Sequence, residues 1–151
     1  LDPAELAGRI AWCPQEAHVF RSTVRGNLAL ARRDVPDEEE MFAALTAAGL
    51  GHWASPEGLD RWVGDHGSEI SGGERQRLAV ARTLLSGAEV IVLDEPTAHL
   101  DAATAHRLVA DLRANLPDHT VIMVTHDESL IDSGDRVLRL GTDVSPASIR
   151  T

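Results

Sequence analysis

Two carboxylates and an imidazole follow two apolar runs of this sequence. The run VIVL leads directly into Asp94 and Glu95, and the run VIMV leads into Thr125 and His126. If strand geometry continues through Asp94 and Glu95, their side chains point to opposite sides and do different work. One carboxylate can then hold a metal ion while the other faces a reacting group. For each run alone, a strand that simply ends in a polar turn is the alternative.

A second group of residues predicts a helix start that suits an anion. Ser71 is a favourable N-cap, and Glu74, three positions later, completes a capping box. Gly72 and Gly73 have no side chain, so a ligand can approach the backbone closely. The free N–H groups of the first turn and the helix dipole attract anions such as phosphate. A well-capped helix with no ligand is the other interpretation of this segment.

The elements that must position these residues follow from the spacing of apolar residues. Strand and helix alternate, which predicts an α/β fold with a parallel sheet whose strand ends gather functional residues. The continuous apolar runs of the second and third strands are typical of strands buried on both faces. Strands are expected over 9–13, 89–94, 119–127 and, more exposed, 135–140; helices over 22–31 (capped by Ser22 or Thr23), 36–50, 73–87 and 102–116; and an irregular connection over 51–70.

The composition excludes several classes of protein. The 151 residues include 24 acidic and 14 basic side chains, none of them Lys, for a net charge of −10. This balance argues against a nucleic-acid-binding face, which needs clustered cations. A single cysteine, Cys13, excludes an internal disulfide and a zinc site built on Cys pairs. No apolar run approaches the ~18 residues of a membrane helix. Because the chain begins with LDPAEL and without Met, we expect a piece of a longer protein.

Five segments resemble the motifs of the ATP-binding-cassette (ABC) ATPases. They occur in the order of the family's motifs and at intervals that fit the family. The resemblance covers the chain to about residue 140, and five motifs in register are far more specific than any one of them. The matching segments are the Q-loop at Gln15, the signature motif at 70–74 (ISGGE for L-S-G-G-Q), the Walker-B strand with its glutamate at Asp94 and Glu95, the D-loop at 98–101 (AHLD for S-A-L-D), and the switch histidine at His126.

The departures from the family pattern affect what the resemblance implies. His99 in place of Ala is similar to one subunit of the bacterial heterodimeric cysteine/glutathione exporter. No G-x-x-x-x-G-K-[ST] P-loop is present, and the chain has no Lys to complete one. The family places that loop before the Q-loop. The resemblance therefore implies a P-loop NTPase-like parallel sheet core, truncated at its N-terminus, with an inserted α-helical subdomain.

The same resemblance divides the chain and points to the exporter branch. The segments EAHVFRSTVRGNLALA and VGDHGSEISGG are similar to exporter sequences that contact the coupling helices of the membrane domain. Phe20 belongs to the exporter pattern, whereas Trp12 is expected to pack in the core. The expected parts are a Q-loop region (1–21), a helical subdomain with the signature motif (22–87), a core with Walker B, D-loop and H-loop (88–140) and a C-terminal tail (141–151).

The family also implies roles for the residues that match its motifs in one nucleotide site. Asp94 would act on Mg²⁺ through water, and Glu95 would be the general base for the attacking water. His126 would contact the γ-phosphate of ATP. Gln15 would sense both Mg²⁺ and the water, and is therefore a candidate for the metal site as well as for catalysis.

A second set of family residues serves a different nucleotide. Ser71, Gly72 and Gly73, with Glu74, would close over the ATP held by the P-loop of a partner domain, so that two domains enclose two nucleotides head to tail. Asp101 would communicate between the two sites. The neighbouring side chains of Arg75 and Arg77 are expected to be structural.

These implications favour the ATP-hydrolysing, energy-coupling domain of an exporter, at the cytoplasmic face of the cell membrane. Its cofactors would be ATP and Mg²⁺, and its partners a second nucleotide-binding domain and the membrane domain, with no nucleic acid. We expect the 151-residue chain alone to be inactive. A soluble ABC ATPase that is not coupled to transport, and a non-catalytic half that completes a partner's site, are the alternatives.

Overall fold

A three-stranded parallel sheet forms the centre of the molecule. The computed structural model describes residues 8–140, so the expectations for 1–7 and 141–151 lie outside it. The strands are β1 (Ile10–Cys13), β2 (Val90–Asp94) and β3 (Thr120–Val124), in the order β1-β2-β3. Trp12 lies opposite Val92, and Val92 opposite Ile122. The predicted α/β fold with a parallel sheet is confirmed.

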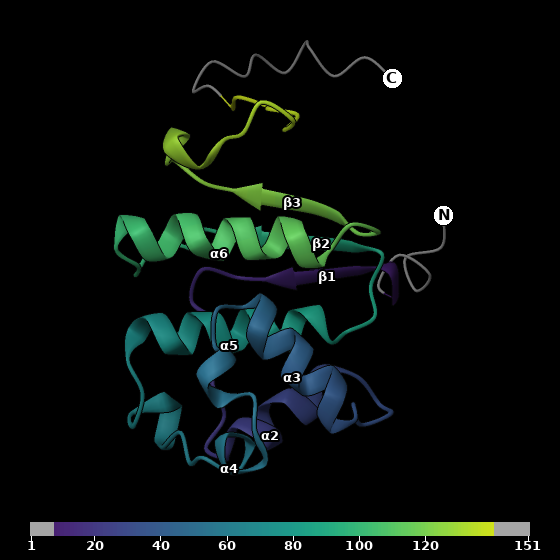
Figure 1. Cartoon of the computed structure of the whole chain (residues 1–151), viewed down its shortest axis with the longest axis vertical. Helices are drawn as coiled ribbons and strands as arrows, with labels where there is room; N and C mark the ends of the chain where they lie inside the picture. Colours follow the sequence, from purple (N-terminus) through teal and green to yellow (C-terminus); the bar gives the residue numbers. More distant parts are fainter. Residues whose placement is uncertain (1–7, 141–151) are drawn as a thin grey trace.

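The helices follow the predicted pattern with shorter bounds. Figure 1 shows α6 in front of the sheet and the other helices beyond β1. The segment 22–31 is divided, with Thr23 as the N-cap of its first part, and the connection over 51–70 contains short helical turns. The helices are α2 (Val24–Leu28), α3 (Glu38–Ala47), α4 (Pro56–Leu59), α5 (Gly72–Leu84) and α6 (Ala102–Asn115), with 3-10 turns at Ala29–Ala31, Gly51–Trp53, Asp65–Gly67 and Glu128–Leu130.

The main core joins one face of the sheet to the helices. Cys13, Ile91 and Leu93 point from the strands into this core, and each is almost fully buried. They belong to one apolar cluster with the inner sides of α2, α3, α5 and α6. The burial of this single cluster fixes the carboxyl ends of β1 and β2 beside the start of α5.

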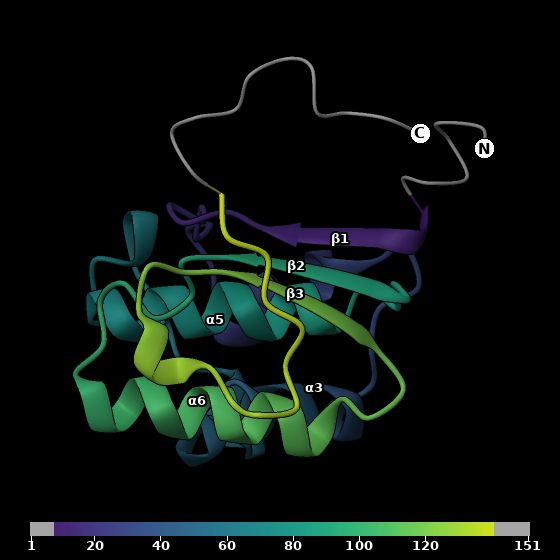
Figure 2. The same ribbon diagram turned by 90° about the horizontal axis from the view of Figure 1, so that it is seen from above.

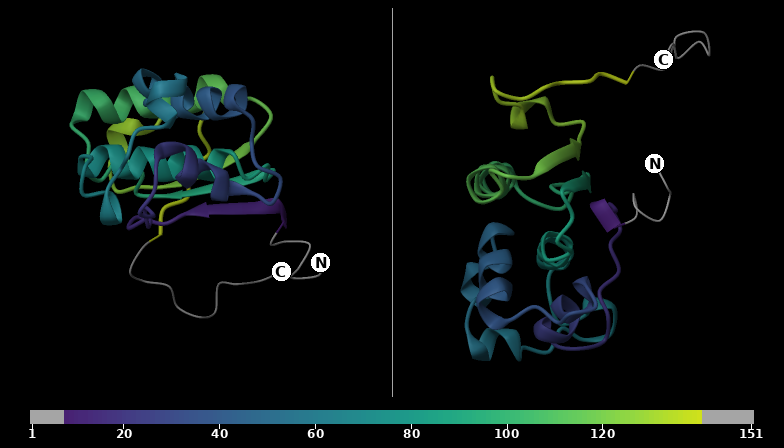
Figure 3. Two further views of the ribbon diagram at one scale, coloured as in Figure 1. Left: turned by 90° about the horizontal axis from the view of Figure 1, so that it is seen from below. Right: turned by 90° about the vertical axis from the view of Figure 1, so that its right-hand side faces the viewer.

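The opposite face of the sheet is uncovered, and this corrects two expectations. The apolar strands are not buried on both faces, since Ile122 and Val124 are 48% and 45% exposed. Trp12 does not pack in the core, because its side chain points to the same uncovered face and is 62% exposed. The reason is that the helices of residues 8–140 lie on one side of the sheet, as two views show (Figures 2 and 3).

The predicted strand over 135–140 is also wrong, since this segment has no regular structure. A strand needs a partner that satisfies its backbone hydrogen bonds. Within the described part of the chain β3 is the last strand of the sheet, and its free edge pairs with nothing. Leu138 and Leu140 are consequently 81% and 89% exposed.

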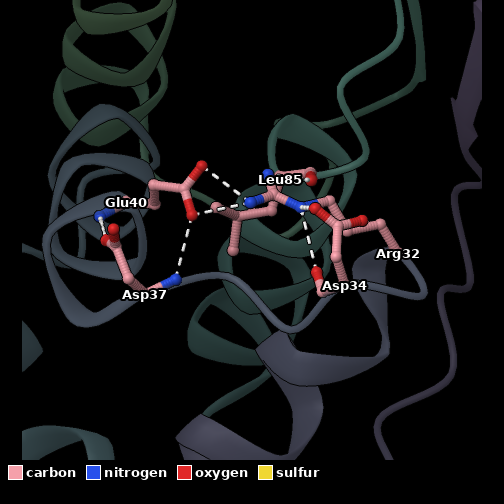
Figure 4. A network of polar contacts seen from close by, with 5 residues as sticks. All are labelled: Arg32, Asp34, Asp37, Glu40 and Leu85. Carbon is pink, nitrogen blue, oxygen red and sulfur yellow. Dashed lines mark hydrogen bonds and ion pairs between the residues drawn. The ribbon is translucent and has the colours of Figure 1, made fainter.

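A polar network attaches α3 to the C-terminal end of α5 (Figure 4). The Nη2 atom of Arg32 donates to both carboxylate oxygens of Glu40, at 2.7 and 2.6 Å, and its Nη1 atom donates to the carbonyl of Leu85 at 3.4 Å. Glu40 also closes the capping box of α3 with Asp37. Hydrogen bonding from Arg32 holds the pKa of Glu40 below its ordinary value. The far end of α5 is therefore fastened to a second helix.

Candidate functional site

Strand geometry stops between the two adjacent carboxylates. Asp94 is the last residue of β2, whereas Glu95 has φ 46°, in the left-handed region. The N–H of Glu95 donates to the carbonyl of Val124 at 2.9 Å, which holds this turn against β3. A non-glycine residue in this region costs about 1–3 kcal/mol and persists only where its surroundings enforce it; such residues cluster at active sites. The conformation of Glu95 is thus consistent with a functional role.

Glu95 and His126 meet at the carboxyl ends of neighbouring strands. Oε1 of Glu95 lies 2.8 Å from Nδ1 of His126, and the two side chains are 17% and 85% exposed. The hydrogen bond that the Glu95 carboxylate accepts from His126, followed by the charge of Glu95, raises the pKa of His126 above its ordinary value. A carboxylate that is largely shielded from solvent therefore stands beside an exposed imidazole. This arrangement can accept a proton from water and offer a hydrogen bond to an anion.

Asp94 fits a magnesium ion only with the help of other ligands. Within residues 8–140 no three His, Cys, Asp or Glu side chains are grouped as a metal site. The Asp94 carboxylate has no hydrogen-bond or ion-pair partner in this part of the chain, so its oxygens are available. Mg²⁺ commonly binds through one or two carboxylates with water and substrate phosphates, which is compatible with this position.

The start of α5 opens into a cleft of about 710 Å³. Ser71, Gly72 and Gly73 line it from the helix, Gln15 lines it from the loop after β1, and Asp101 lines it from the start of α6. The predicted capping box is present, since the Ser71 Oγ atom accepts from the N–H of Glu74 at 3.1 Å and a Glu74 carboxylate oxygen accepts from the N–H of Ser71 at 2.8 Å. The Glu74 carboxylate is thus engaged in the cap.

The comparisons with known proteins identify the family. The family model described as "ABC transporter" matches residues 2–98. The chain belongs to the ABC transporter family. Among its ABC relatives, an ATP-dependent lipid A-core flippase of Chromobacterium violaceum is 37% identical over 89% of this chain and 23% of its own length. The glutathione/L-cysteine transport system ATP-binding/permease protein CydC of Escherichia coli is 41% identical over 83% of this chain and 22% of its own.

A solved structure gives the same assignment. A bacterial Atm1-family ABC exporter with ATP bound has a TM-score of 0.74 and 34% identity, over 83% of this chain and 22% of that one. The similarity is thus to the ATP-binding part of exporter-type ABC transporters. The chain spans less than a quarter of the length of these relatives. In the described range, no helix combines the length and the apolar character needed to cross a bilayer.

The predicted ABC residues gather in two places. Asp94, Glu95 and His126 lie at the ends of β2 and β3, but none of them lines the cleft. The signature residues line the cleft together with Gln15. Asp94, Glu95 and His126 are thus absent from the lining of the cleft, whereas Gln15, which was expected to act on the same nucleotide as they do, lines it with the signature residues.

The glycine pair of the signature motif has two different surroundings. A Cβ on Gly73 would lie 2.8 Å from Cδ2 of Leu100, so a larger residue at this position would require the Leu100 side chain of the D-loop to shift. A Cβ on Gly72 would make only ordinary contact, at 3.5 Å from Arg75. Gly73 is therefore packed closely against the D-loop, whereas Gly72 leaves room for a ligand.

Asp101 of the D-loop is the N-cap of α6. Its two carboxylate oxygens accept from the N–H and the hydroxyl of Thr104, at 3.0 and 2.6 Å. These hydrogen bonds hold the pKa of Asp101 below its ordinary value. The proposed communication between sites would thus pass through a residue that also fixes the start of a helix.

Two donors beside the cleft have no acceptor within residues 8–140. The Gln76 side chain is 4% exposed, and its Nε2 atom is buried without a hydrogen-bond partner, as is the Nε atom of Arg77. Both residues line the cleft. An unsatisfied buried donor costs about 1–3 kcal/mol, which an arriving acceptor would relieve. Arg75 instead donates to the carbonyls of Gly67 and Ile70, as expected of a structural residue.

Sequence reasoning missed two side chains that hold the segment after Gln15. Asn27 is fully buried and hydrogen-bonded to the backbone of Phe20. Arg82 of α5 donates to the carbonyl of His18. Asn27, directly before the apolar segment 28–31, was a usable signal, because a buried amide needs specific partners. The partner of Arg82 is 64 positions away in the sequence and had no local signal.

The contact between Glu95 and His126 leads to a testable prediction about the pKa of His126. We expect Glu95→Gln to lower the pKa of His126 towards its ordinary value of about 6.5, because the carboxylate that stabilises the imidazolium is removed. The pKa of His126 is raised in the folded protein, so the pair makes its full contribution to the free energy of unfolding at a pH below the ordinary pKa of His. This contribution disappears as the pH rises through the raised pKa. NMR titration of the imidazole in nucleotide-free and metal-free protein measures the shift. An identical titration curve in both proteins would contradict the pairing, and His126→Gln assigns the signal.

Proposed function

We propose that this chain is the ATP-hydrolysing, energy-coupling part of an ABC exporter domain, and that it works in a head-to-tail pair of such domains. The observation that carries the proposal is the Glu95–His126 contact beside the free carboxylate of Asp94. Family membership and similarity to exporter relatives support it. The decisive experiment is ATP turnover of the parent protein with Glu95 replaced by Gln.

The hydrolysing site would use the ends of β2 and β3. Asp94 would hold Mg²⁺, which neutralises charge on the phosphates. Glu95, shielded and held by its backbone turn, would orient the attacking water and accept its proton. His126 is exposed enough to reach a terminal phosphate, and Gln15 is on a loop at the same edge of the sheet. These four side chains bind, orient and move a proton without forming a covalent intermediate.

The cleft at the start of α5 would serve the nucleotide of a partner domain. The N–H groups of the first turn and the helix dipole favour an anion there. The unpaired donor of Gln76 indicates that the cleft has unused hydrogen-bonding capacity. The absence of Glu95 and His126 from the lining of the cleft supports a nucleotide at Ser71 that differs from the one on which they would act.

The remaining assignments concern the arrangement of the parent protein. The residues over 22–87 would form the helical subdomain. Its exposed Trp62, together with the exposed Phe20 of the preceding Q-loop region, would be suited to contact the coupling helices of a membrane domain. The ATPase would then stand at the cytoplasmic face of the membrane. The transported substrate stays unassigned, since relatives named for lipid A-core and for glutathione/L-cysteine match to a similar degree.

The 151-residue chain alone should bind Mg-ATP only weakly, with a dissociation constant above the low micromolar range. Micromolar binding requires about 8 kcal/mol, whereas an exposed helix N-terminus contributes about 0.3–1 kcal/mol. The sequence has neither a P-loop nor a Lys to hold the phosphates, and the charges of Asp94 and Glu95 repel a polyanion. Isothermal calorimetry with Mg-ATP measures the affinity.

The control for this experiment is the parent protein with an intact P-loop, which should bind in the micromolar range. Hydrolysis is assayed in parallel, and none is expected from the 151-residue chain. A low micromolar dissociation constant for this chain would show that another segment holds the nucleotide, and would overturn the proposed division of labour.

A further inference from the structure

The segment after Gln15 leaves the sheet and is fastened again on the helical side. The Gln15 side chain is exposed and has no hydrogen bond within residues 8–140. The carbonyl of His18 accepts a hydrogen bond from Nη2 of Arg82 at 2.8 Å. The guanidinium of Arg82 also lies over the ring of Phe20, 5.3 Å from its centroid. A single side chain of α5 thus holds the segment directly after the loop that carries Gln15.

A second side chain fixes the end of the same segment. Oδ1 of Asn27 accepts from the N–H of Phe20 at 2.8 Å, and Nδ2 of Asn27 donates to the carbonyls of Phe20 and Thr23, each at 3.0 Å. Asn27 is fully buried, so these contacts are shielded from water. Between the last strand residue, Cys13, and the fastened segment lie only residues 14–17, which carry Gln15.

Arg82 is a partly buried cation whose contacts are unusual, because they do not include a carboxylate in the described part of the chain. Within residues 8–140 it forms no ion pair with a carboxylate, and burial lowers its pKa. Removing a guanidinium from water is unfavourable unless its hydrogen bonds are satisfied. Its recorded partners are one carbonyl and one aromatic ring, both on the segment that follows Gln15. The helix that carries Arg82 begins at the cleft that Gln15 also lines.

We propose that Arg82 is a positioning residue for Gln15. By fastening the His18 carbonyl to α5, it makes the loop of Gln15 move together with the helix whose start would close over the partner's nucleotide. Engagement of one nucleotide by α5 would then place Gln15 at the other. The inference rests on the proposed function, because it needs Gln15 to act in the reaction.

A double-mutant cycle in the complete parent protein tests this coupling. Arg82→Leu should lower kcat/KM by about 10- to 100-fold, as expected when a distant contact that orients a reacting group is lost, and should raise the Mg²⁺ concentration needed for half-maximal activity. Gln15→Ala should have a similar effect. If Arg82 acts through Gln15, the double variant should be no slower than Gln15→Ala alone.

The controls separate positioning from general stability. Arg33→Leu removes an exposed arginine that has no recorded partner in the described part of the chain, and it should leave turnover and Mg²⁺ dependence unchanged. Arg82→Lys keeps a cationic donor and should recover part of the activity. If Arg82→Leu melts below the assay temperature, Arg82→Lys replaces it in the cycle with Gln15→Ala.

Three outcomes would overturn the inference. If the losses of Arg82→Leu and Gln15→Ala multiply in the double variant, Arg82 does not act through Gln15, while the proposed function stands. The same holds if an Arg82 variant leaves turnover and Mg²⁺ dependence unchanged. If Gln15→Ala alone changes neither quantity, the proposed role of Gln15 and this inference fail together, and the Glu95→Gln result decides separately whether the hydrolysing site is correct.

Discussion

Replacing Glu95 by Gln in the parent protein is expected to abolish ATP turnover and to leave ATP binding intact. The amide keeps the size of the side chain but cannot take a proton from water. Loss of a general base typically costs about 10²–10⁴ in rate. The shielding of Glu95 and its 2.8 Å contact with His126 favour the upper part of this range, because both hold the carboxylate in one place. Steady-state phosphate release and equilibrium nucleotide binding measure the two quantities.

Glu89→Gln is the matched control for this substitution. Glu89 directly precedes β2, at the end of the strand opposite to Glu95, and it pairs with Arg9 on the surface. The same chemical change there should leave turnover unaltered. An unchanged hydrolysis rate in Glu95→Gln would remove Glu95 from the role of base, and a simultaneous loss of nucleotide binding would point to a structural role instead.

The parts of the site that depend on local sequence were predicted well. The capping box of α5 needs only Ser71 and Glu74, which are three positions apart, and the structure contains it. The common edge for Glu95 and His126 followed from two apolar strands in a parallel sheet. The direct contact between them did not, because it depends on the backbone turn at Glu95, whose positive φ has no signal in the sequence.

The parts that depend on distant neighbours were predicted poorly. An apolar run indicates that a strand can be buried, but it does not show what covers each face, so Trp12 was assigned to a core that does not surround it. The strand expected over 135–140 failed for a similar reason, since alternation of apolar residues does not show whether the fold brings a segment to the free edge of β3. The close packing of Gly73 against Leu100 was not predicted either, because the fold brings Leu100 from another segment.

Replacing Ser71 by Arg in one subunit of a two-domain parent should stop hydrolysis at the site whose P-loop belongs to the other subunit. The Ser71 hydroxyl caps α5 at the cleft, and the substitution puts a long cation where the helix start would meet phosphate. Assembled pairs with one mutant subunit, in which each site is assayed separately by inactivating the other through Glu95→Gln, measure the effect. The site that contains the mutant's own P-loop should keep its activity.

Ser55→Arg distinguishes a blocked cleft from a lost helix cap. Ser55 caps α4 through the N–H of Gly58, as Ser71 caps α5, but it does not line the cleft. Loss of such a cap costs about 0.5–2 kcal/mol of stability, so both variants should melt at lower temperature, while only Ser71→Arg should silence one site selectively. Failure of the mutant's own site alone would mean that α5 serves the nucleotide of its own chain. The lining of the cleft argues against that result, because it includes Ser71 but neither Glu95 nor His126.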